Sequence, residues 1–388
     1  MGNNERNKNM VLTNGQEKGL KIAVERYKNK EPYTVIAGYA GSGKSTLVKF
    51  IIDALEIDED NVVYIAYTGK ASLVLRNKGC SNSITAHRLL YRAIEKPDRT
   101  YEFIPKKNLE CDYRLIVLDE CSMLPQEMWD LLLSHKIHVI ALGDPGQLPP
   151  VDGISTILDN PHVMLDEVVR QAQDNPIIRL SMDIRAGKWI NYGGPKECRV
   201  ISHEKVSDRL LMGADQVLCG KNITRHSLND RLRKIKFGEQ CTMAPIDGDK
   251  IICLHNEWQE LGDNTEPLVN GMIGTVMNIE LSENKLYSPK MVANFISDNG
   301  GVYKGLQMDY KIFTEKETTI NKENWYKYMY AKKAYEFDYG YAITVHKFQG
   351  SEAEKVVVFD EWLGDREYHC KWLYSAVTRS SKMLVVVK

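Results

Sequence analysis

The sequence predicts an α/β protein with two domains, each built on a parallel sheet and each carrying a small β insertion. The chain of 388 residues is longer than the roughly 100 to 200 residues of one domain. Short apolar runs rich in Val and Ile alternate with helix-like segments, which is typical of β-α-β units. Two stretches interrupt this alternation, one with prolines and one with several glycines, and they mark the insertions.

The first domain is expected over residues 1–166. Four apolar runs predict its sheet: Tyr33 to Ala37, Val62 to Tyr67, Leu115 to Leu118 and His138 to Leu142. An insertion over residues 91–112 contains a strand-like segment, residues 100–104, that follows a turn-forming Lys-Pro-Asp-Arg and is closed by Pro105. We therefore expect a short β-hairpin that projects from this domain.

The second domain is expected over residues 167–270 and 336–388, with a helix near its beginning that starts at Asn175-Pro176. Its expected strands are Gln216 to Cys219, Lys250 to Leu254, Gly340 to Thr344, Lys355 to Phe359 and Met383 to Val387. Residues 271–335 are irregular, strand-like and rich in glycine. This pattern predicts a small β insertion within the second domain.

Composition excludes several classes of protein. The fractions of 43% hydrophobic and 27% charged residues are those of an ordinary globular protein, and no apolar run reaches the roughly 18 residues of a membrane span. The N-terminus lacks a secretory pattern, so a cytoplasmic protein is expected. Eight dispersed cysteines without a C-x-x-C pair predict reduced thiols. The net charge of −1 confines any nucleic-acid site to a local patch.

The segment GYAGSGKST, residues 38–46, follows a strand and opens a helix, which is the context in which G-x-x-x-x-G-K-[ST] binds a nucleotide. Its glycines let backbone N–H groups turn toward phosphate, and the helix N-terminus adds positive potential. Lys44 is expected to bridge the outer phosphates and Ser45 to ligate Mg²⁺. The expected nucleotide-binding residues of this loop are Gly41, Ser42, Gly43, Lys44, Ser45 and Thr46.

A second strand ends in Asp119-Glu120, which places two carboxylates at the carboxyl edge of the sheet, beside the P-loop. Asp119 suits the magnesium shell. Glu120 suits the positioning and deprotonation of an attacking water. Together with the P-loop, these residues predict an NTPase.

The next strand leads into GDPGQLPPV, residues 143–151, which resembles motif III of superfamily 1 helicases in the form typical of the RecD and Dda branch. Further blocks resemble motifs of that family in order: Leu12 to Gln16, Tyr67 to Ala71, Thr85 to His87, Leu165 to Arg170, Ala342 to Glu352 and Tyr374 to Ser380. The resemblance implies two RecA-like domains with ATP and Mg²⁺ in the cleft between them. It also implies a pin at the first insertion and an SH3-like second insertion.

The resemblance assigns further roles. Gln147 and Arg170 would act at the γ-phosphate, and Arg379 would be a finger from the second domain that raises the rate about a thousandfold or more. Gln16 would contact the adenine, and it would carry more of the base recognition because Val169 stands where many relatives have an aromatic residue. The expected catalytic residues are Lys44, Glu120, Gln147, Arg170 and Arg379, and Gly350 and Glu352 complete the nucleotide-binding set.

Nucleic-acid contacts are expected in the same blocks and in one basic stretch. Residues 221–236 hold six basic side chains against one acid, interleaved with polar residues that suit phosphates and sugars. An apolar stripe in this stretch makes a core-facing helix the alternative. Aromatic residues between Trp325 and Tyr335 are expected to pack the second insertion, with base stacking as the alternative. The expected DNA-binding residues are Thr68, Lys70, His87, Phe103, Asn222, Arg225, Thr344, His346 and Lys347.

These observations predict an ATP-dependent DNA helicase that translocates 5′-to-3′ on single-stranded DNA, with the polarity implied by the resemblance alone. The expected partners are single-stranded DNA, duplex junctions and proteins of replication or recombination, and a role in DNA replication or repair is expected. A monomer in a bacterial or phage-infected cytoplasm, without a membrane partner, is expected. Two alternatives stay open: an ATP-gated translocase or remodeller that does not separate strands, and a P-loop enzyme of nucleotide metabolism.

Overall fold

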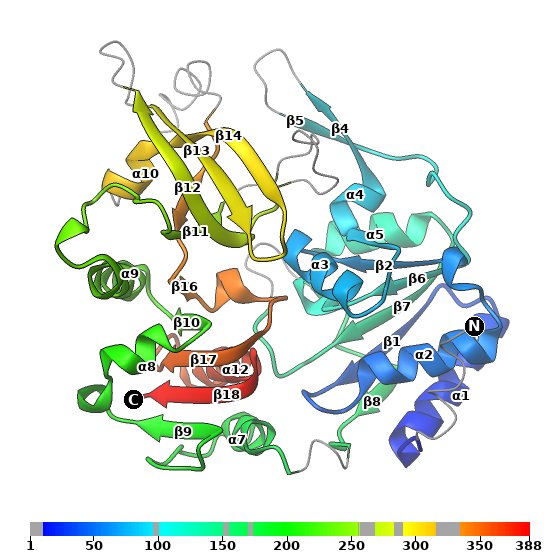
Figure 1. Cartoon of the computed structure of the whole chain (residues 1–388). Helices are drawn as coiled ribbons and strands as arrows, with labels where there is room; N and C mark the ends of the chain where they lie inside the picture. Colours follow the sequence, from blue (N-terminus) through cyan, green and yellow to red (C-terminus); the bar gives the residue numbers. More distant parts are fainter. Residues whose placement is uncertain are drawn as a thin grey trace.

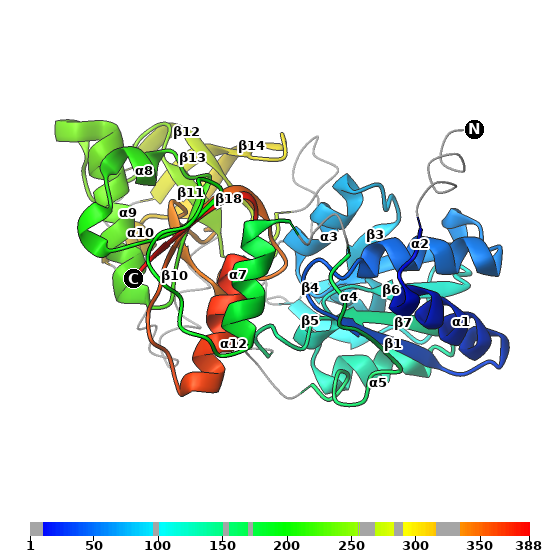
Figure 2. The same cartoon turned by 90° about the horizontal axis from the view of Figure 1, so that it is seen from below.

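The computed structural model describes residues 11–95, 101–149, 155–169, 174–254, 256, 268–282, 290–315 and 334–388. Two α/β bodies lie side by side, the first at the right of Figure 1 and the second at the left (Figures 1 and 2). A twisted β layer lies above the second body in Figure 1. The predicted α/β class with two parallel sheets is confirmed. Arg170, residues 96–100 with their predicted turn, and residues 316–333 lie outside the described part of the chain.

The first domain is a six-stranded parallel sheet in the order β3-β2-β6-β7-β1-β8. Its strands are β1 (Tyr33–Gly38), β2 (Val62–Ala66), β3 (Ser83–Thr85), β6 (Leu115–Leu118), β7 (His138–Gly143) and β8 (Val163–Leu165). The helices are α1 (Asn14–Lys28), α2 (Lys44–Leu55), α3 (Gly69–Asn77), α4 (Ala86–Leu90) and α5 (Gln126–Ser134), with short 3-10 turns η2 (Glu59–Asn61) and η3 (Cys121–Met123). Every residue of β2, β6 and β7 is buried. Burial on both faces of the sheet explains why these strands are continuous apolar runs.

The predicted hairpin of the first domain is confirmed. Strands β4 (Tyr91–Glu95) and β5 (Tyr101–Pro105) pair antiparallel, with Tyr91 opposite Pro105. Phe103 is 39% exposed, and its ring presents an edge contact to Tyr91 and to His87, with centroids 6.4 and 6.2 Å away. The base of the hairpin therefore packs against the segment that follows β3.

The second domain is a five-stranded parallel sheet in the order β16-β10-β17-β18-β9. Its strands are β9 (Cys198–Ile201), β10 (Gln216–Cys219), β16 (Ala342–Thr344), β17 (Ala353–Phe359) and β18 (Ser380–Val387). The helices are α7 (Pro176–Arg185), α8 (Asp208–Met212), α9 (Asn222–Phe237) and α12 (Arg366–Val377), with 3-10 turns η4 (His203–Lys205), η5 (Gly238–Gln240) and η6 (His346–Phe348). Asn175 caps α7, with its side chain accepting from the N–H of Ile177, as the Asn-Pro start predicts.

The β insertion is an antiparallel sheet in the order β14-β13-β12-β11-β15. It contains β11 (Lys250–Cys253), β12 (Ile273–Ser282), β13 (Lys290–Ser297), β14 (Val302–Asp309) and β15 (Phe337–Tyr339). Helix α10 (Tyr310–Glu315) follows β14 in the chain. The sheet therefore extends on both sides of the expected range 271–335. The expectation that Lys250 to Leu254 belongs to the parallel sheet is wrong, because β11 pairs antiparallel with β12 and β15. A strand buried on both faces is continuously apolar in either kind of sheet.

The β insertion also packs on the first domain. Leu73 of α3 is 7% exposed and belongs to the apolar core formed by Val269, Met272 and the strands of the insertion. Gly69, at the start of α3, lies so close to Val269 that a Cβ there would be 2.4 Å from the valine side chain. The first domain, the second domain and the insertion thus surround one central space.

No described helix is both long and apolar enough to cross a bilayer. All eight cysteines lie in the described part of the chain, and all are free thiols, as their spacing predicts.

Candidate nucleotide site and nucleic-acid groove

The P-loop joins β1 to α2, and its glycines have the backbone conformations that such a loop requires. Gly41 and Gly43 both have φ of +77°, in the left-handed region. A Cβ at Gly43 would also lie 2.4 Å from the Gln16 amide nitrogen. The N–H of Val169 donates to the carbonyl of Gly41 at 3.1 Å, so the block before Arg170 lies against the loop. The loop leads directly into the N-terminus of α2, where free backbone N–H groups favour an anion.

Gln16 lies under this loop and is 3% exposed. Its Nε2 donates to the carbonyl oxygens of Ser42 and Gly43 at 3.2 and 3.3 Å. Its Oε1 accepts from the N–H of Thr13 at 2.9 Å, which completes a capping box at the start of α1. Gln16 therefore positions the P-loop, and the adenine contact expected of it stays a prediction.

The loop also has polar groups that suit a triphosphate. Lys44 Nζ donates to the carbonyls of Gly38 and Tyr39 at 2.5 and 3.3 Å, so the ammonium lies along the inside of the loop. The Ser42 hydroxyl is buried and has no hydrogen-bond partner within the described residues. A buried polar atom without a partner costs free energy, which an incoming phosphate oxygen would recover. Ser45 is exposed on the first turn of α2.

The two carboxylates after β6 have different environments. Burial raises the pKa of Asp119, the neighbouring charge of Glu120 raises it further, and Lys44 opposes the rise. Glu120 has φ of +49°, which is strained for a residue with a side chain, and its N–H donates to Asp119 Oδ1 at 2.9 Å. This donor set fits Mg²⁺: Ser45 and Asp119 would hold the ion, which would neutralise phosphate charge.

Arg379 reaches this site from the other domain. Its side chain is buried, and NH1 lies 3.1 Å from Glu120 Oε1 while Nε donates to the carbonyl of Ser375 at 3.1 Å. Gly350 lies beside the same carboxylate, since a Cβ at this position would be 3.2 Å from Glu120 Oε2 and 3.0 Å from the Thr68 hydroxyl. Residues from four separate sequence blocks thus meet at the domain boundary.

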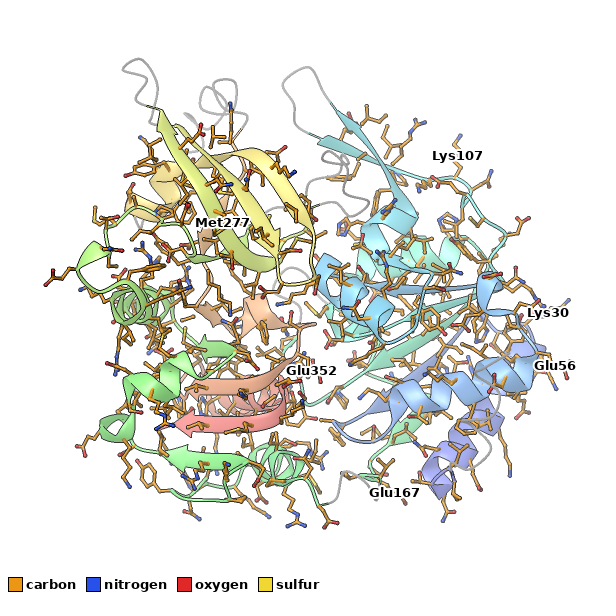
Figure 3. All side chains as sticks on the ribbon, viewed as in Figure 1. Lys30, Glu56, Lys107, Glu167, Met277 and Glu352 are labelled. Carbon is orange, nitrogen blue, oxygen red and sulfur yellow. The ribbon has the colours of Figure 1, made fainter. Side chains whose placement is uncertain are left out.

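Other expected nucleotide-site residues lie elsewhere or outside the described chain. Glu352 lies at the domain boundary in Figure 3, where its carboxylate forms an exposed ion pair with Lys78 of the first domain at 3.0 Å. Gln147 is half-buried and donates through its backbone N–H to the carbonyl of Asp144 at 3.1 Å. Arg170 is outside the described residues. The roles predicted for these three residues stay predictions.

Sequence reasoning missed a polar link between the domains. The Tyr374 hydroxyl, on α12, donates to Asp144 Oδ2 at 2.7 Å and accepts from the P-loop N–H of Ala40 at 2.8 Å. Beside it, the Ser375 hydroxyl accepts from the N–H of Leu148 at 2.9 Å. All of these residues lie in the sequence motifs identified above. The spacing of the motifs, however, does not indicate which side chains meet across the cleft. Only the tertiary arrangement pairs them.

A second contact between the domains involves Tyr39 of the P-loop. Arg185, the last residue of α7, stacks over the ring of Tyr39 with 3.5 Å between the guanidinium carbon and the ring centroid. The second domain therefore contacts the P-loop through Tyr374 at Ala40 and through Arg185 at Tyr39.

The central space is a groove that opens between the domains, with a volume of about 480 Å³. Its walls come from α3 and the loop after β2 in the first domain, and from the ends of β10 and β16 in the second. Of the nine residues predicted to bind DNA, seven line it: Thr68, Lys70, His87, Asn222, Thr344, His346 and Lys347. The sequence did not indicate the other polar lining residues, Asn256, Asn270 and Gln349.

Ionisable groups in the groove have shifted pKa values. Burial lowers the pKa of Lys70 to about 7, and Lys250 lowers it while Asp298 opposes. The Lys70 ammonium lies 4.5 Å from the centroid of the Phe348 ring. Burial also lowers the pKa values of His87 and His346. Burial therefore favours the neutral forms of these groups, and a bound phosphate would shift them back toward their charged forms.

Arg225 and Phe103, also predicted to bind DNA, do not line the groove. Arg225 is 6% exposed, and its guanidinium binds Asp338 at 2.5 Å and Asn222 Oδ1 at 3.1 Å. Arg225 therefore orients Asn222, which does line the groove.

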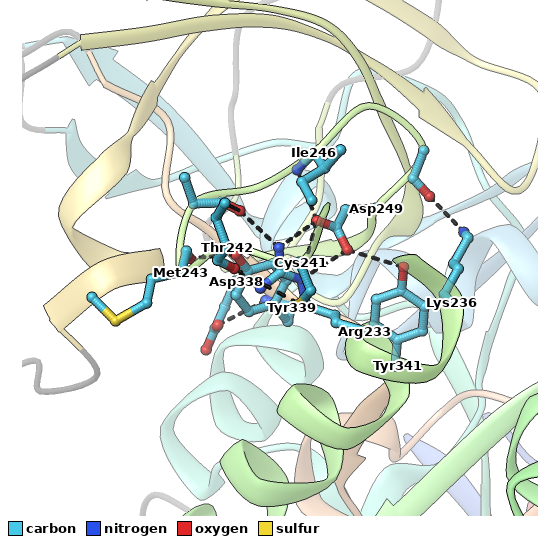
Figure 4. Close-up of polar contacts among 12 residues, drawn as sticks. Arg233, Lys236, Cys241, Thr242, Met243, Ile246, Asp249, Asp338, Tyr339 and Tyr341 are labelled. Carbon is cyan, nitrogen blue, oxygen red and sulfur yellow. Dashed lines mark hydrogen bonds and ion pairs between the residues drawn. The ribbon is translucent and has the colours of Figure 1, made fainter. Parts of the chain in front are cut away.

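The basic stretch at residues 221–236 is largely structural, as its apolar stripe allows. Arg233 is almost fully buried and binds Asp249 through Nε and NH2 at 2.9 to 3.1 Å, and it donates to the carbonyls of Thr242 and Ala244 at 2.7 Å (Figure 4). Its guanidinium also lies 4.0 Å from the Tyr339 ring centroid. Helix α9 thus joins the parallel sheet to the β insertion.

The fold and the site define a class before any comparison: a P-loop NTPase in which two RecA-like domains share a nucleotide site and a second, polar groove. Two family models match the sequence, an AAA domain over residues 12–193 and a UvrD-like helicase C-terminal domain over residues 339–387. Together with the ordered motifs, these matches support the predicted resemblance to superfamily 1 helicases of the Dda and RecD branch.

Curated relatives match parts of the chain. The ATP-dependent DNA helicase dda of Enterobacteria phage T4 is 31% identical over 195 residues, covering 47% of this chain and 44% of the relative. The ATP-dependent RecD2 DNA helicase of Deinococcus radiodurans is 33% identical over 167 residues, covering 41% of this chain and 22% of the relative. The chain thus spans less than half the length of either relative.

Solved structures match almost the whole chain. A Bacteroides Pif1 helicase in complex with ADP-AlF3 and single-stranded DNA aligns with a TM-score of 0.55 and 19% identity, covering 97% of this chain and 92% of that one. A structure of Pif1 helicases at forked duplex DNA aligns with a TM-score of 0.55, 21% identity and the same coverage. This likeness confirms the two-domain fold.

Proposed function

We propose that the protein is an ATP-dependent DNA helicase that moves along single-stranded DNA and separates duplexes. This proposal rests on the way in which the two domains form the cleft between them. The nucleotide site and the groove are built from the same two domains, and Arg379 touches Glu120 across the boundary at 3.1 Å. Closure of the cleft at the nucleotide therefore changes the separation of the two groove walls.

In the proposed hydrolysis step, water attacks the γ-phosphate to release ADP and phosphate. Glu120 positions the water and accepts its proton. Lys44 and Arg379 offset the negative charge that develops on the transferred phosphoryl group. The backbone conformation of Glu120 fixes the position of its carboxylate, and an incoming triphosphate would take over the contact that Arg379 now makes with Glu120.

The groove would bind the phosphates and bases of one strand. Lys70 and Lys347 suit phosphates, whereas Asn222, Thr344 and His346 suit sugars and base edges. Two walls that bind the strand and move relative to each other would convert each hydrolysis cycle into a step along DNA. The direction of movement, 5′-to-3′, is proposed from the resemblance to the RecD and Dda branch.

The hairpin is proposed to act as the separating pin. Its base touches His87 at the groove, and Ile94, Phe103 and Ile104 are between 38% and 39% exposed. An apolar hairpin beside the path of a strand can stack on the last base pair of a duplex.

The test of the proposed function is an ATPase assay with and without an oligonucleotide, followed by unwinding of duplexes that carry a 5′ or a 3′ tail. We expect stimulation by single-stranded DNA and unwinding of the 5′-tailed duplex only. Lys44→Ala is the control for hydrolysis by this site. An ATPase rate that DNA does not change would instead favour a nucleotide-metabolising enzyme.

A variant in which residues 97–105 are replaced by a short Gly/Ser linker tests the pin. We expect nearly normal DNA-stimulated ATPase and loss of unwinding, because the hairpin would meet only the duplex. Normal unwinding by this variant would refute the pin. Loss of both activities would show that the segment supports the fold.

A further inference from the structure

The carboxyl edge of the second sheet continues beyond the groove. Its five strands are parallel, so all of their carboxyl ends lie along one edge, in the order β16, β10, β17, β18, β9. His346 follows β16 and Asn222 follows β10, and both line the groove. Trp362 and Lys388 follow β17 and β18, and both line a second cavity of about 220 Å³.

Direct contacts connect the two cavities. His346 in the groove shares a hydrogen bond of 2.9 Å with the hydroxyl of Tyr368 on α12. The Tyr368 ring packs under the loop after β17, where a Cβ at Gly364 would be 3.1 Å away. Glu361 of the same loop accepts from the N–H of Gly220, which lines the groove, at 2.6 Å. The second cavity is therefore one strand farther along the same edge.

Three stacked rings end at this cavity. Trp372 is fully buried and stacks with His369, with centroids 6.0 Å apart and planes 21° from parallel. His369 stacks in turn with Trp362, with centroids 4.5 Å apart and planes 19° from parallel. Trp362 is nevertheless 52% exposed, and its indole N–H donates to the carbonyl of Gly364 at 3.0 Å, which fixes the ring. A planar base would add a fourth member to this stack.

A second exposed aromatic ring, two cations and an unused polar atom also line this cavity. Trp189 is 70% exposed, and the Arg366 guanidinium and the Lys388 ammonium lie 5.8 and 5.2 Å from its ring centroid. His369 is 8% exposed, lines the cavity, and has an Nδ1 without a hydrogen-bond partner in the described part of the chain. Its other nitrogen lies 3.4 Å from Asp360, the acidic side chain that lines the cavity.

Exposed aromatic rings combined with cations are the chemistry that binds unpaired nucleotides without regard to sequence. We propose that this cavity is a further single-strand binding site, in which Trp362 stacks on a base and Arg366 and Lys388 contact phosphates of the strand that leaves the groove. The proposal rests on the proposed function, because the strand must first occupy the groove. Continuity with the groove favours a nucleic acid over an acidic peptide.

The test measures the affinity of the full chain for oligothymidylates of about 4 to about 16 nucleotides, the range of common single-strand site sizes. We expect Trp362→Ala to weaken binding of the longest strand about 5-fold to 100-fold, the usual effect of removing one base-aromatic stack. The shortest strand, which fills only the groove, should bind as before. Trp362→Phe should restore most of the loss, and Met212→Ala, which removes an exposed apolar side chain outside the cavity, should change nothing.

Other results would overturn the inference in distinguishable ways. Unchanged affinity of Trp362→Ala for every length would show that no base stacks there. An equal loss for short and long strands would show that Trp362 acts through the groove. A synthetic acidic peptide that quenches Trp362 fluorescence when the long strand does not would assign the cavity to protein docking. A wild-type chain that binds no oligonucleotide would refute the proposed function, and with it this site.

Discussion

Tyr374→Phe removes one oxygen atom from the link between the two domains and leaves the ring in place. The hydroxyl donates to Asp144 Oδ2 at 2.7 Å and accepts from the N–H of Ala40 at 2.8 Å. Burial raises the pKa of Tyr374, so the hydroxyl stays protonated and able to donate throughout the usable pH range. The variant therefore tests whether this link couples the P-loop to the second domain.

The expected magnitude follows from the burial of the acceptor. A hydrogen bond to a charged group contributes about 1.5 to 3 kcal/mol, and Asp144 is only 4% exposed. Asp144 keeps a second contact, because its Oδ1 accepts from the N–H of Gly146 at 2.9 Å. We therefore expect Tyr374→Phe to destabilise the closed arrangement, in which Tyr374 contacts Asp144 and Ala40, by about 2 kcal/mol. This loss corresponds to roughly a 30-fold lower population of the closed arrangement.

The assay is steady-state ATP hydrolysis at saturating single-stranded DNA. We expect kcat to fall by up to about 30-fold with a smaller change in KM for ATP, because the ring still packs and the P-loop is otherwise intact. Tyr192→Phe, which removes an exposed hydroxyl, is the matched control. A Tyr374→Phe enzyme with the wild-type kcat would refute the coupling, and so would a loss no larger than that of the control.

Three further predictions follow from the site and the fold. Arg379→Ala should lower kcat about a thousandfold while nucleotide affinity, measured by titration, changes far less; a variant that loses nucleotide binding entirely would instead indicate a structural ion pair. Burial lowers the pKa of Lys70 to about 7, so the free side chain loses its charge above that pH, whereas bound phosphate favours the charged form. Affinity for single-stranded DNA should therefore fall as the pH rises above about 7, by at most about tenfold per pH unit, and Lys70→Arg should remove this fall; an unchanged pH profile in Lys70→Arg would contradict it. Asp249→Ala leaves the buried Arg233 guanidinium without its carboxylate and should destabilise the fold by about 3 to 5 kcal/mol in urea unfolding, whereas Asp208→Ala, which breaks an exposed pair, should cost less than about 1 kcal/mol. Equal effects of the two aspartate variants would show that burial of the Arg233 pair does not matter.

Local sequence determines the central strands and the loop that follows the first of them. The expected strand at Tyr33 to Ala37 ends one residue before β1 does, and the glycines of GYAGSGKST occupy the left-handed conformations that their lack of a side chain permits. The short edge strands β3 and β9 were not predicted, because polar residues interrupt their sequences, Ser-Ile-Thr and Cys-Arg-Val-Ile, and leave no continuous apolar run.

The identities of the chemical groups were therefore readable from the sequence, since each lies in a short block whose spacing has a local physical cause. Their pairing was not. Glu120 meets Arg379, Tyr374 meets Asp144, and Arg225 turns inward to Asp338, and each of these contacts joins segments more than a hundred residues apart. A basic residue on an amphipathic helix has the same local pattern whether it faces water or a buried carboxylate, as α9 shows. Sequence periodicity reports which face of an element is buried, whereas the packing of whole domains decides what lies against that face.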